Sequence, residues 1–380
     1  MDFSFTPEQE QYRKEVIRFG RERLGGSVRE LDRKEEFDRQ GWRECGQFGI
    51  QGLPVPEQYG GSAADILTTV VALEALGYAC RDNGLLFSLG AHIWACELPL
   101  FNFGTESQKE KYLARLASGE WIGALAMAEP EAGSDAFSIK TTAIRKGDSY
   151  LLNGSKSFVT NGPLADLMLV VASLDPSKGW QALTAFLLEK KTAGVTVHPQ
   201  EKMGLRSSTL GEVFFEDCEV SAGDRLGEEG VGAAIFTHAM ECERAFILST
   251  AVGTMERVLE RCVDYAKQRR QFGKPIGKFQ LVASKLVDMR VRLETARNLL
   301  YRVAWLKSMG KSVFAEAAMA KLHISESWVA SCLDAVQVFG GYGYLTDLEM
   351  ERELRDALGS RIFSGTSEIQ RNLIAQLMGL

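Results

Sequence analysis

Two glutamates stand close together in the segment MECERAF at residues 240–246, where a carboxylate could act as a general base. On a helix, Glu241 and Glu243 would point about 200° apart, because each residue turns the chain by about 100°. Only one of the two can therefore face a given site. A glutamate among the apolar neighbours of this segment would be partly buried, which would raise its pKa towards a useful range. The alternative is an exposed helix glutamate that pairs with a nearby basic residue.

The sequence contains none of the usual motifs for a metal site, a phosphate-binding loop or a serine nucleophile. Seven cysteines form no CxxC pair and four histidines form no HxxxH pair, so we expect reduced, mostly buried thiols and no metal site. The chain contains no GxSxG or GxxxxGKS/T motif. The run GVGAAI from Gly230 follows no predicted strand and lacks a third glycine, which argues against a dinucleotide-binding turn.

Four polar segments without charge runs are the other candidates for a site. In chain order they are AMAEPEAGSD (126–135), NGSKSFVTNG (153–162), QRRQFGKPIGKFQ (268–280) and SRIFSGTSEIQR (360–371). Each segment, taken alone, is best explained as a turn. Their occurrence together, in this order, is what makes them informative.

The elements around these segments change type twice along the chain. The first 120 residues predict successive helices, of which the first is capped by Thr6 before Pro7. Residues 121–225 predict a small barrel or sandwich of short strands, and residues 226–380 predict an antiparallel bundle. We expect helices over 37–49, 65–79, 85–103, 105–116, 233–268, 281–309 and 313–338. We expect strands over 139–144, 150–152, 168–172, 184–188, 195–198 and 213–215, with turns at Gly147-Asp148, Asn153-Gly154, Asn161-Gly162-Pro163 and Ser177-Lys178-Gly179. The expected fold class is α+β and mainly helical.

Composition and charge limit the class of partner. The 380 residues are 45% hydrophobic and 25% charged, which is typical of a folded globular protein and excludes a disordered chain. A net charge of −6 without a basic run argues against nucleic acid and anionic membranes as partners. The longest apolar stretch, near Leu167–Leu174, is far shorter than the roughly 20 residues of a membrane helix, and the N-terminus shows no apolar signal core. We therefore expect a cytoplasmic protein.

Taken together, the four segments resemble those of the acyl-CoA dehydrogenase family, and LPVPEQYGG, DAVQVFGGYGY and LRDA also fit, over essentially the whole chain. The resemblance implies an N-terminal helical domain at 1–120, a middle β domain at 121–225 and a C-terminal four-helix bundle at 226–380. It also implies removal of hydrogen from the carbons α and β to a thioester carbonyl. No protein side chain accepts a hydride, so this reaction needs a flavin, which is FAD in the family.

The resemblance assigns flavin contacts by position. They are Met127, Ala128, Ser134, Phe158, Thr160, Arg269, Phe272, Gln280, Gln337, Gly341, Thr366 and Glu368. Phe158 stands where a tryptophan is common, and the forked donors of Arg269 suit a pyrophosphate. In the family the flavin diphosphate is typically shared with a second subunit, so we expect a homotetramer or at least a dimer.

The base departs from the commonest family pattern. Many members carry a glutamate where this chain has Ser364, and a serine hydroxyl alone is too weak a base. A branch that includes isovaleryl-type enzymes takes its base from the long helix opening the C-terminal domain, immediately before an arginine. The resemblance therefore selects Glu243, which precedes Arg244. It also implies substrate contacts by Ser134, Glu241, Arg244 and Ser364, the last through its backbone N–H.

The acyl group and the electron acceptor stay open at this point. SRIFSGT and RDNGLLFSLGAH resemble flavoenzymes that oxidise prolyl groups on a peptidyl carrier protein in secondary metabolism, whereas GGYGYLTD and ERAF resemble generic acyl-CoA enzymes. Coenzyme A and a phosphopantetheinyl carrier protein both present a phosphopantetheine arm and negative charge. The alternatives are a short- or branched-chain acyl-CoA dehydrogenase, an oxidase or monooxygenase on the same fold, and a non-catalytic relative. Electrons would pass to an electron-transfer flavoprotein or to oxygen.

Overall fold

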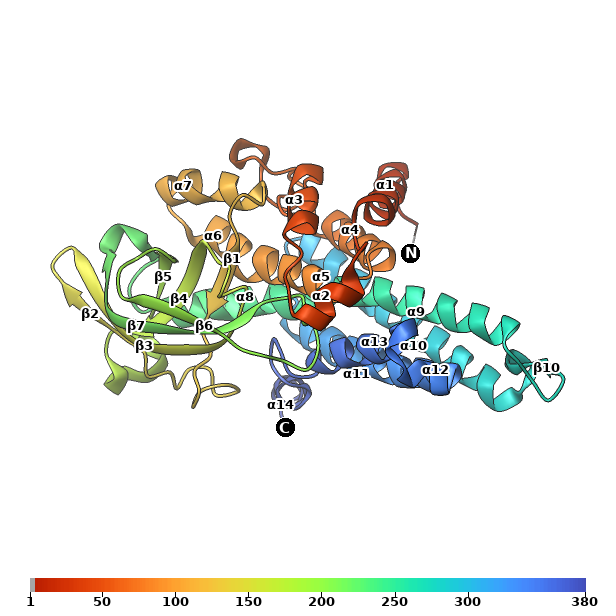
Figure 1. The fold of residues 1–380 in the computed structure, drawn as a ribbon. Coiled ribbons are helices and arrows are strands. Elements are labelled where there is room, and N and C mark those ends of the chain that lie inside the picture. Colours follow the sequence, from red (N-terminus) through yellow and green to blue (C-terminus); the bar gives the residue numbers. More distant parts are fainter. Residues whose placement is uncertain (1–3) are drawn as a thin grey trace.

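The structure is a computed structural model that describes residues 4–380. Residues 1–3, part of the N-terminal segment in which we expect no signal sequence, lie outside the described residues. Figure 1 shows a sheet at one end of the molecule, a bundle of long helices that extends to the other end, and the N-terminal helices along one side of both. The order helical, β, helical is the one predicted from the sequence.

Helices make up the N-terminal part. They are α1 (Pro7–Arg23), α2 (Val28–Lys34), α3 (Arg39–Phe48), α4 (Ile66–Ala79), α5 (Asn83–Gly90), α6 (Leu98–Phe103) and α7 (Glu106–Ala117), with a π-helical segment η2 (Ala91–Glu97) between α5 and α6. The predicted cap of α1 is confirmed, because the Gln9 amide donates to Thr6 Oγ1 at 3.2 Å. Asp65 caps α4 in the same way, through the Thr68 amide at 2.7 Å.

The run from α5 to α6, residues 83–103, is the most apolar part of the N-terminal region. By length and composition it could cross a membrane, and it is the one such helix among the described residues. A helix is predicted over 85–103, but the longest apolar stretch in the sequence analysis is the one at 167–174, so the membrane-like length and composition of this run were not predicted. In the structure 89% of the most apolar 18-residue window of this run is buried, and the rings of Trp94 and Phe246 pack with centroids 5.1 Å apart. The run therefore forms core, and it supports the helix that carries Glu243.

The middle part is one sheet with the strand order β6-β7-β3-β2-β4-β5-β8, to which β1 adds by pairing with β4. The strands are β1 (Gly123–Ala126), β2 (Thr142–Lys146), β3 (Ser149–Thr160), β4 (Leu167–Ser173), β5 (Leu183–Glu189), β6 (Val195–Pro199), β7 (Leu210–Ser221) and β8 (Arg225–Leu226). β1 and β8 are not among the strands predicted from the sequence. The turn predicted at Asn153-Gly154 is wrong: β3 continues through it with a bulge, where the pairing to β7 shifts between Leu152 and Gly154. Gly154 has a φ of 141° and lies against Thr141, which leaves no room for a side chain.

The C-terminal part is the helix bundle. Its elements are α8 (Gly232–Phe246), α9 (Ser249–Gln268), the hairpin β9 (Arg270–Gln271) and β10 (Lys274–Pro275), α10 (Gln280–Ser308), α11 (Phe314–Phe339), α12 (Gly341–Tyr344), α13 (Met350–Gly359) and α14 (Ser367–Leu377). The single helix predicted over 233–268 is wrong, because α8 ends at Phe246. The Ser249 hydroxyl donates to the Phe246 carbonyl at 2.7 Å and so takes up a carbonyl at the end of α8.

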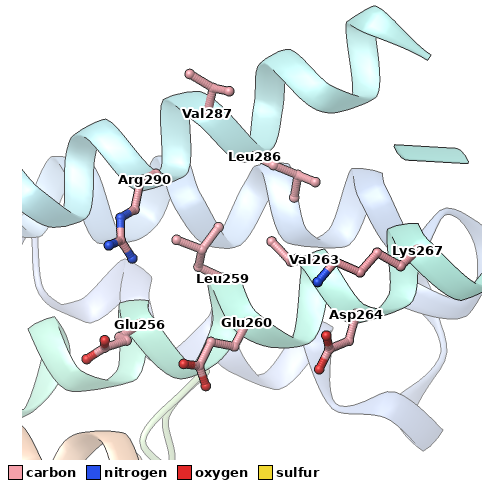
Figure 2. A pocket seen from close by; sticks show the side chains of 9 residues that line it. All are labelled: Glu256, Leu259, Glu260, Val263, Asp264, Lys267, Leu286, Val287 and Arg290. Carbon is pink, nitrogen blue, oxygen red and sulfur yellow. The ribbon is translucent and has the colours of Figure 1, made fainter. Parts of the chain in front are cut away.

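A groove runs between α9 and α10 (Figure 2). It is lined by Glu256, Leu259, Glu260, Val263, Asp264, Lys267, Leu286, Val287 and Arg290. Part of its charge is already paired, since Glu256 binds Arg297 at 2.7 Å and Arg290 binds Glu294 at 3.1 Å. No residue that the sequence analysis assigned to a site lines this groove.

Candidate active site

The carboxylate of Glu243 and the hydroxyl of Ser364 meet at the centre of the candidate site. Ser364 Oγ donates to Glu243 Oε1 at 2.5 Å, although the two residues are 121 positions apart. Glu243 lies near the end of α8, and Ser364 lies in the turn between α13 and α14. The ring of Phe363 packs on Phe87 of α5, with centroids 4.5 Å apart, and so anchors this turn on the N-terminal helices.

Two cations lie beside this pair. The Arg244 guanidinium is 5.7 Å from the centre of the Phe314 ring, and its buried Nε has no hydrogen-bond partner in the described part of the chain. Lys321 of α11 donates from Nζ to the Gly365 carbonyl at 2.7 Å. Burial raises the pKa of Glu243, and the Ser364 hydroxyl and the charges of Arg244 and Lys321 offset part of this rise. The result is a carboxylate that is more basic than an exposed glutamate, which suits a general base.

Glu241 does not join this cluster. Its carboxylate accepts a hydrogen bond from the Val313 amide at 2.7 Å and lies 3.4 Å from Lys307 Nζ. The prediction that only one of the two glutamates can face a given site is therefore confirmed by their separate surroundings. The substrate contact assigned to Glu241 stays a prediction.

The first two polar segments meet at the ends of β1 and β3. The Ser157 amide donates to the Ala128 carbonyl at 2.8 Å. Lys156 Nζ donates to the Met127 carbonyl at 2.9 Å and to Glu129 Oε1 at 2.8 Å. These contacts fix the backbone at Met127 and Ala128, two of the predicted flavin contacts.

Glu129 and Lys156 form a buried ion pair that was not predicted from the sequence. Burial lowers the pKa of Lys156 to about 8, while the charge of Glu129 opposes this change. Glu129 also accepts hydrogen bonds from the amides of Lys140 and Thr141, at 2.6 and 3.0 Å. The signal in the sequence was three acids in AMAEPEAGSD and one base in NGSKSFVTNG, but nothing along the chain shows which acid pairs with Lys156.

This junction is flanked by three predicted flavin contacts that are at least partly exposed: Phe158, Thr160 and Ser134. Phe158 has a φ of 58°, and 62% of the residue is exposed. Thr160 is half-buried where β3 pairs with Leu210 of β7, and Ser134 is exposed. An exposed aromatic ring and two hydroxyls beside a fixed backbone form a surface on which a flat polar molecule could lie.

Thr366 and Glu368 follow Ser364 at the start of α14. Thr366 caps this helix by accepting a hydrogen bond from the Ile369 amide at 3.3 Å. Gln370 binds back to the turn, donating to the carbonyls of Ser364 and Gly365 at 3.2 and 2.9 Å. Glu368 is exposed in the first turn of α14. This end of the site is therefore held by α14.

The remaining predicted flavin contacts lie elsewhere in the chain. They are Arg269, Phe272, Gln280, Gln337 and Gly341, and all are exposed. The Arg269 guanidinium lies 5.8 Å from the centre of the Tyr342 ring, and Phe272 at the tip of the hairpin is 92% exposed. Figure 1 shows this hairpin at the end of the bundle opposite the sheet. A single chain therefore does not bring the two groups together.

The structure holds no candidate for metal chemistry within the residues it describes. No group of three or more His, Cys, Asp or Glu residues there is placed to hold a metal ion. All seven cysteines are free and buried, as predicted.

Comparisons with known proteins cover the chain from end to end. Family models match in three parts: acyl-CoA dehydrogenase, N-terminal domain, at residues 6–120; middle domain, at 124–218; and C-terminal domain, at 230–379. An L-prolyl-[peptidyl-carrier protein] dehydrogenase of Pseudomonas fluorescens is 42% identical and covers 100% of both chains. The crystal structure of the prolyl acyl carrier protein oxidase AnaB is 54% identical with a TM-score of 0.98, over 99% of this chain and 100% of that one. A structure of PigA with FAD and proline is 40% identical with a TM-score of 0.97, over 100% of both chains.

Proposed function

The chain belongs to the acyl-CoA dehydrogenase family, and from this membership we propose that it oxidises a prolyl or similar aminoacyl thioester on a carrier protein. It is a FAD-dependent oxidoreductase that removes hydrogen from an acyl or aminoacyl thioester. In the proposed reaction Glu243 takes the proton from Cα. The bond electrons form the Cα–Cβ double bond as a hydride leaves Cβ.

The observation that carries this proposal is the contact between Glu243 and Ser364. Many family members have a glutamate at the position of Ser364, and here the Ser364 hydroxyl points at a carboxylate supplied by α8 instead, 2.5 Å away. In this proposal the base comes from α8, and its carboxylate lies beside residue 364, where other family members carry their glutamate. Burial raises the pKa of this carboxylate, which matches the task of taking a proton from a weakly acidic carbon.

The thioester carbonyl needs a hydrogen-bond donor to make its Cα–H acidic. The Ser364 amide has no acceptor among the described residues, and it stands on the same residue as the hydroxyl that binds Glu243. We assign it to the carbonyl oxygen. A substrate bound in this way would have its Cα beside the base, because one residue contacts both groups.

Bound FAD supplies the acceptor for the hydride. The donor set fits this group: Phe158 offers an exposed aromatic face, Ser134 and Thr160 offer hydroxyls, and the backbone at Met127 and Ala128 is held rigid from below. Anaerobic titration with the carrier-bound substrate should bleach the absorbance of the purified yellow protein, and a colourless protein that takes up no FAD would contradict the proposal.

Arg269 and its neighbours reach a flavin only if a second copy of the chain brings them to it. Arg269 and Phe272 belong to the segment around the β9–β10 hairpin, which lies at the end of the bundle opposite the sheet (Figure 1). Gln280 begins α10 just after this hairpin, and Gln337 and Gly341 lie near the start of α12, whose Tyr342 contacts Arg269. Large apolar side chains are exposed along the whole of α10, directly after it and on α12: Leu281, Val287, Val291, Trp305, Met309 and Tyr344. Buried contacts between copies would cover them. These features support a homodimer or a homotetramer, and light scattering that finds a flavin-loaded monomer would exclude both.

The choice of a carrier protein over coenzyme A rests on the relatives. The Pseudomonas fluorescens enzyme and AnaB are both named for a prolyl group on a carrier protein, and AnaB has the higher identity to this chain, 54%. Rates of flavin reduction with prolyl carrier protein, prolyl-CoA, isovaleryl-CoA and butyryl-CoA should be highest for the first. A preference for butyryl-CoA would point to an acyl-CoA dehydrogenase.

The identity to an oxidase favours a second candidate function, in which oxygen takes the electrons. Turnover in air without any other acceptor, with hydrogen peroxide formed in equal amount to the product, would show an oxidase. Turnover only with an electron-transfer flavoprotein or an artificial dye would show a dehydrogenase.

A further inference from the structure

Lys321 of α11 is a buried cation to which the proposed reaction gives no task. Its side chain is fully buried, and its Nζ donates to the Gly365 carbonyl at 2.7 Å. Nζ also lies 5.8 Å from the centre of the Phe363 ring. Lys321 therefore contacts the residues on both sides of Ser364.

The turn that Lys321 holds has a backbone conformation that needs support. The φ angles of Ser364 and Gly365 are 54° and 86°, and residues other than glycine rarely adopt the left-handed region. Gln370 supports the same turn with hydrogen bonds to both carbonyls. Gln370 is neutral, so of these two hydrogen-bond donors to the turn only Lys321 carries a charge.

Charged groups face Lys321 from three elements. Burial lowers the pKa of Lys321 to about 8, and Arg244 of α8 lowers it as well, whereas Glu243, Glu326 of α11 and Glu368 of α14 raise it. In return, Arg244 and Lys321 both lower the pKa of Glu243, against the larger effect of burial. The cation and the carboxylate thus favour each other's charged form.

We propose that Lys321 is a positioning residue of the active site: it fixes the Ser364–Gly365 turn against Glu243, and its charge favours the ionised carboxylate. The proposal rests on the proposed function, in which Glu243 is the base. A carboxylate can accept a proton only when it is ionised, so a cation nearby makes the base available at lower pH. A neutral residue at 321 would leave the carboxylate in a buried place with one opposite charge fewer.

The experiment measures the titration of Glu243 without substrate. Infrared difference spectra of the flavin-loaded protein across pH, with Glu243→Gln used to assign the carboxyl band, give the midpoint for this one group. Lys321→Gln removes the charge and can still donate a hydrogen bond, whereas Lys321→Met removes both. In each variant the midpoint should rise by about one pH unit, the lower end of the effect of a neighbouring opposite charge.

Two further variants serve as controls. Lys285→Met makes the same chemical change in a lysine that binds Asp334 at 2.8 Å, away from the Glu243 cluster, and should leave the midpoint of Glu243 unchanged. Lys321→Arg keeps a cation at the site and should return the midpoint towards that of the wild type. Flavin absorbance and thermal unfolding show that each variant is folded and loaded.

An unchanged midpoint in folded Lys321→Gln and Lys321→Met would overturn the proposal. If Lys321→Met does not fold, Lys321→Gln alone decides. A raised midpoint together with Glu243→Gln that reduces its flavin at the wild-type rate would support the effect of Lys321 on Glu243 and refute the proposed function instead. The two failures are therefore distinguishable.

Discussion

Glu241 and Glu243 lie two positions apart on α8 and bind different parts of the molecule: Glu243 accepts a hydrogen bond from the Ser364 hydroxyl, and Glu241 accepts one from the Val313 amide. This difference makes each glutamate a control for the other. Glu243→Gln should slow flavin reduction by about 10²–10⁴-fold, the usual contribution of a general base. Glu241→Gln should change the rate much less, because a glutamine oxygen can still accept from Val313. Single-turnover reduction followed at the flavin absorbance tests both, and equal losses would remove the assignment of Glu243.

The hydroxyl of Ser364 stabilises the ionised form of Glu243, and it lowers the pKa of this carboxyl. Ser364→Ala removes the donor and keeps the backbone N–H that we assign to the thioester carbonyl. The pKa of Glu243 should rise, so the acid limb of the rate should move to higher pH. At pH values above both midpoints the rate should stay within about tenfold of the wild type. A loss as large as that of Glu243→Gln at high pH would show that the hydroxyl has another task.

The sequence predicted those features of the site that depend on local geometry. The helical period was enough to separate the directions of Glu241 and Glu243, and the cap at Thr6 follows from residues within one turn. The contact between Glu243 and Ser364 could not be predicted in this way, because it joins residues 121 positions apart. Only the resemblance to a family pointed to both residues.

Two predictions from the sequence were wrong: the turn at Asn153-Gly154 and the single helix over 233–268. Asn153-Gly154 suits a tight turn and also a bulge, and the strand pairing of β3 with β7 decided for the bulge. The break between α8 and α9 contains neither proline nor glycine, since it falls at Ile247 and Leu248, both buried. The break is set by how these two side chains pack in the core, so no residue type in the sequence indicates that α8 ends there.

Lys156 and Glu129 form a buried ion pair under the predicted flavin contacts. Lys156→Met would leave the Glu129 carboxylate buried without its partner, which typically costs about 3–5 kcal/mol of the free energy of unfolding. Urea unfolding should show this loss, together with weaker FAD binding, because the Met127 carbonyl loses its donor. Lys140→Met removes an exposed partner of Glu131 and should leave the unfolding midpoint unchanged. Equal midpoints for the two variants would contradict the structural importance of the buried pair.

Arg269 and Arg270 offer a test of the second flavin-binding group. Arg269 lies over Tyr342, whereas Arg270 donates to the Gly273 carbonyl within its own hairpin at 2.8 Å. If a second copy brings Arg269 to the flavin pyrophosphate, Arg269→Ala should weaken FAD binding at least about tenfold, the loss of a charge-assisted contact. Arg270→Ala should bind FAD as the wild type does. Flavin content after gel filtration, with light scattering on the same peak, measures binding and assembly together.

The short distance between Ser364 Oγ and Glu243 Oε1, 2.5 Å, predicts that a carboxylate on residue 364 can occupy the place of the present one. Ser364→Glu alone would set two carboxylates side by side, which raises the pKa of one of them and should slow the reaction at neutral pH. Glu243→Gly alone removes the base and should lose activity. The double variant Glu243→Gly/Ser364→Glu keeps one carboxylate, moved to the commoner family position, and should recover part of the rate, most visibly on straight-chain substrates. Single-turnover flavin reduction compares the three variants, and a double variant no faster than Glu243→Gly would show that position 364 cannot carry the base in this chain.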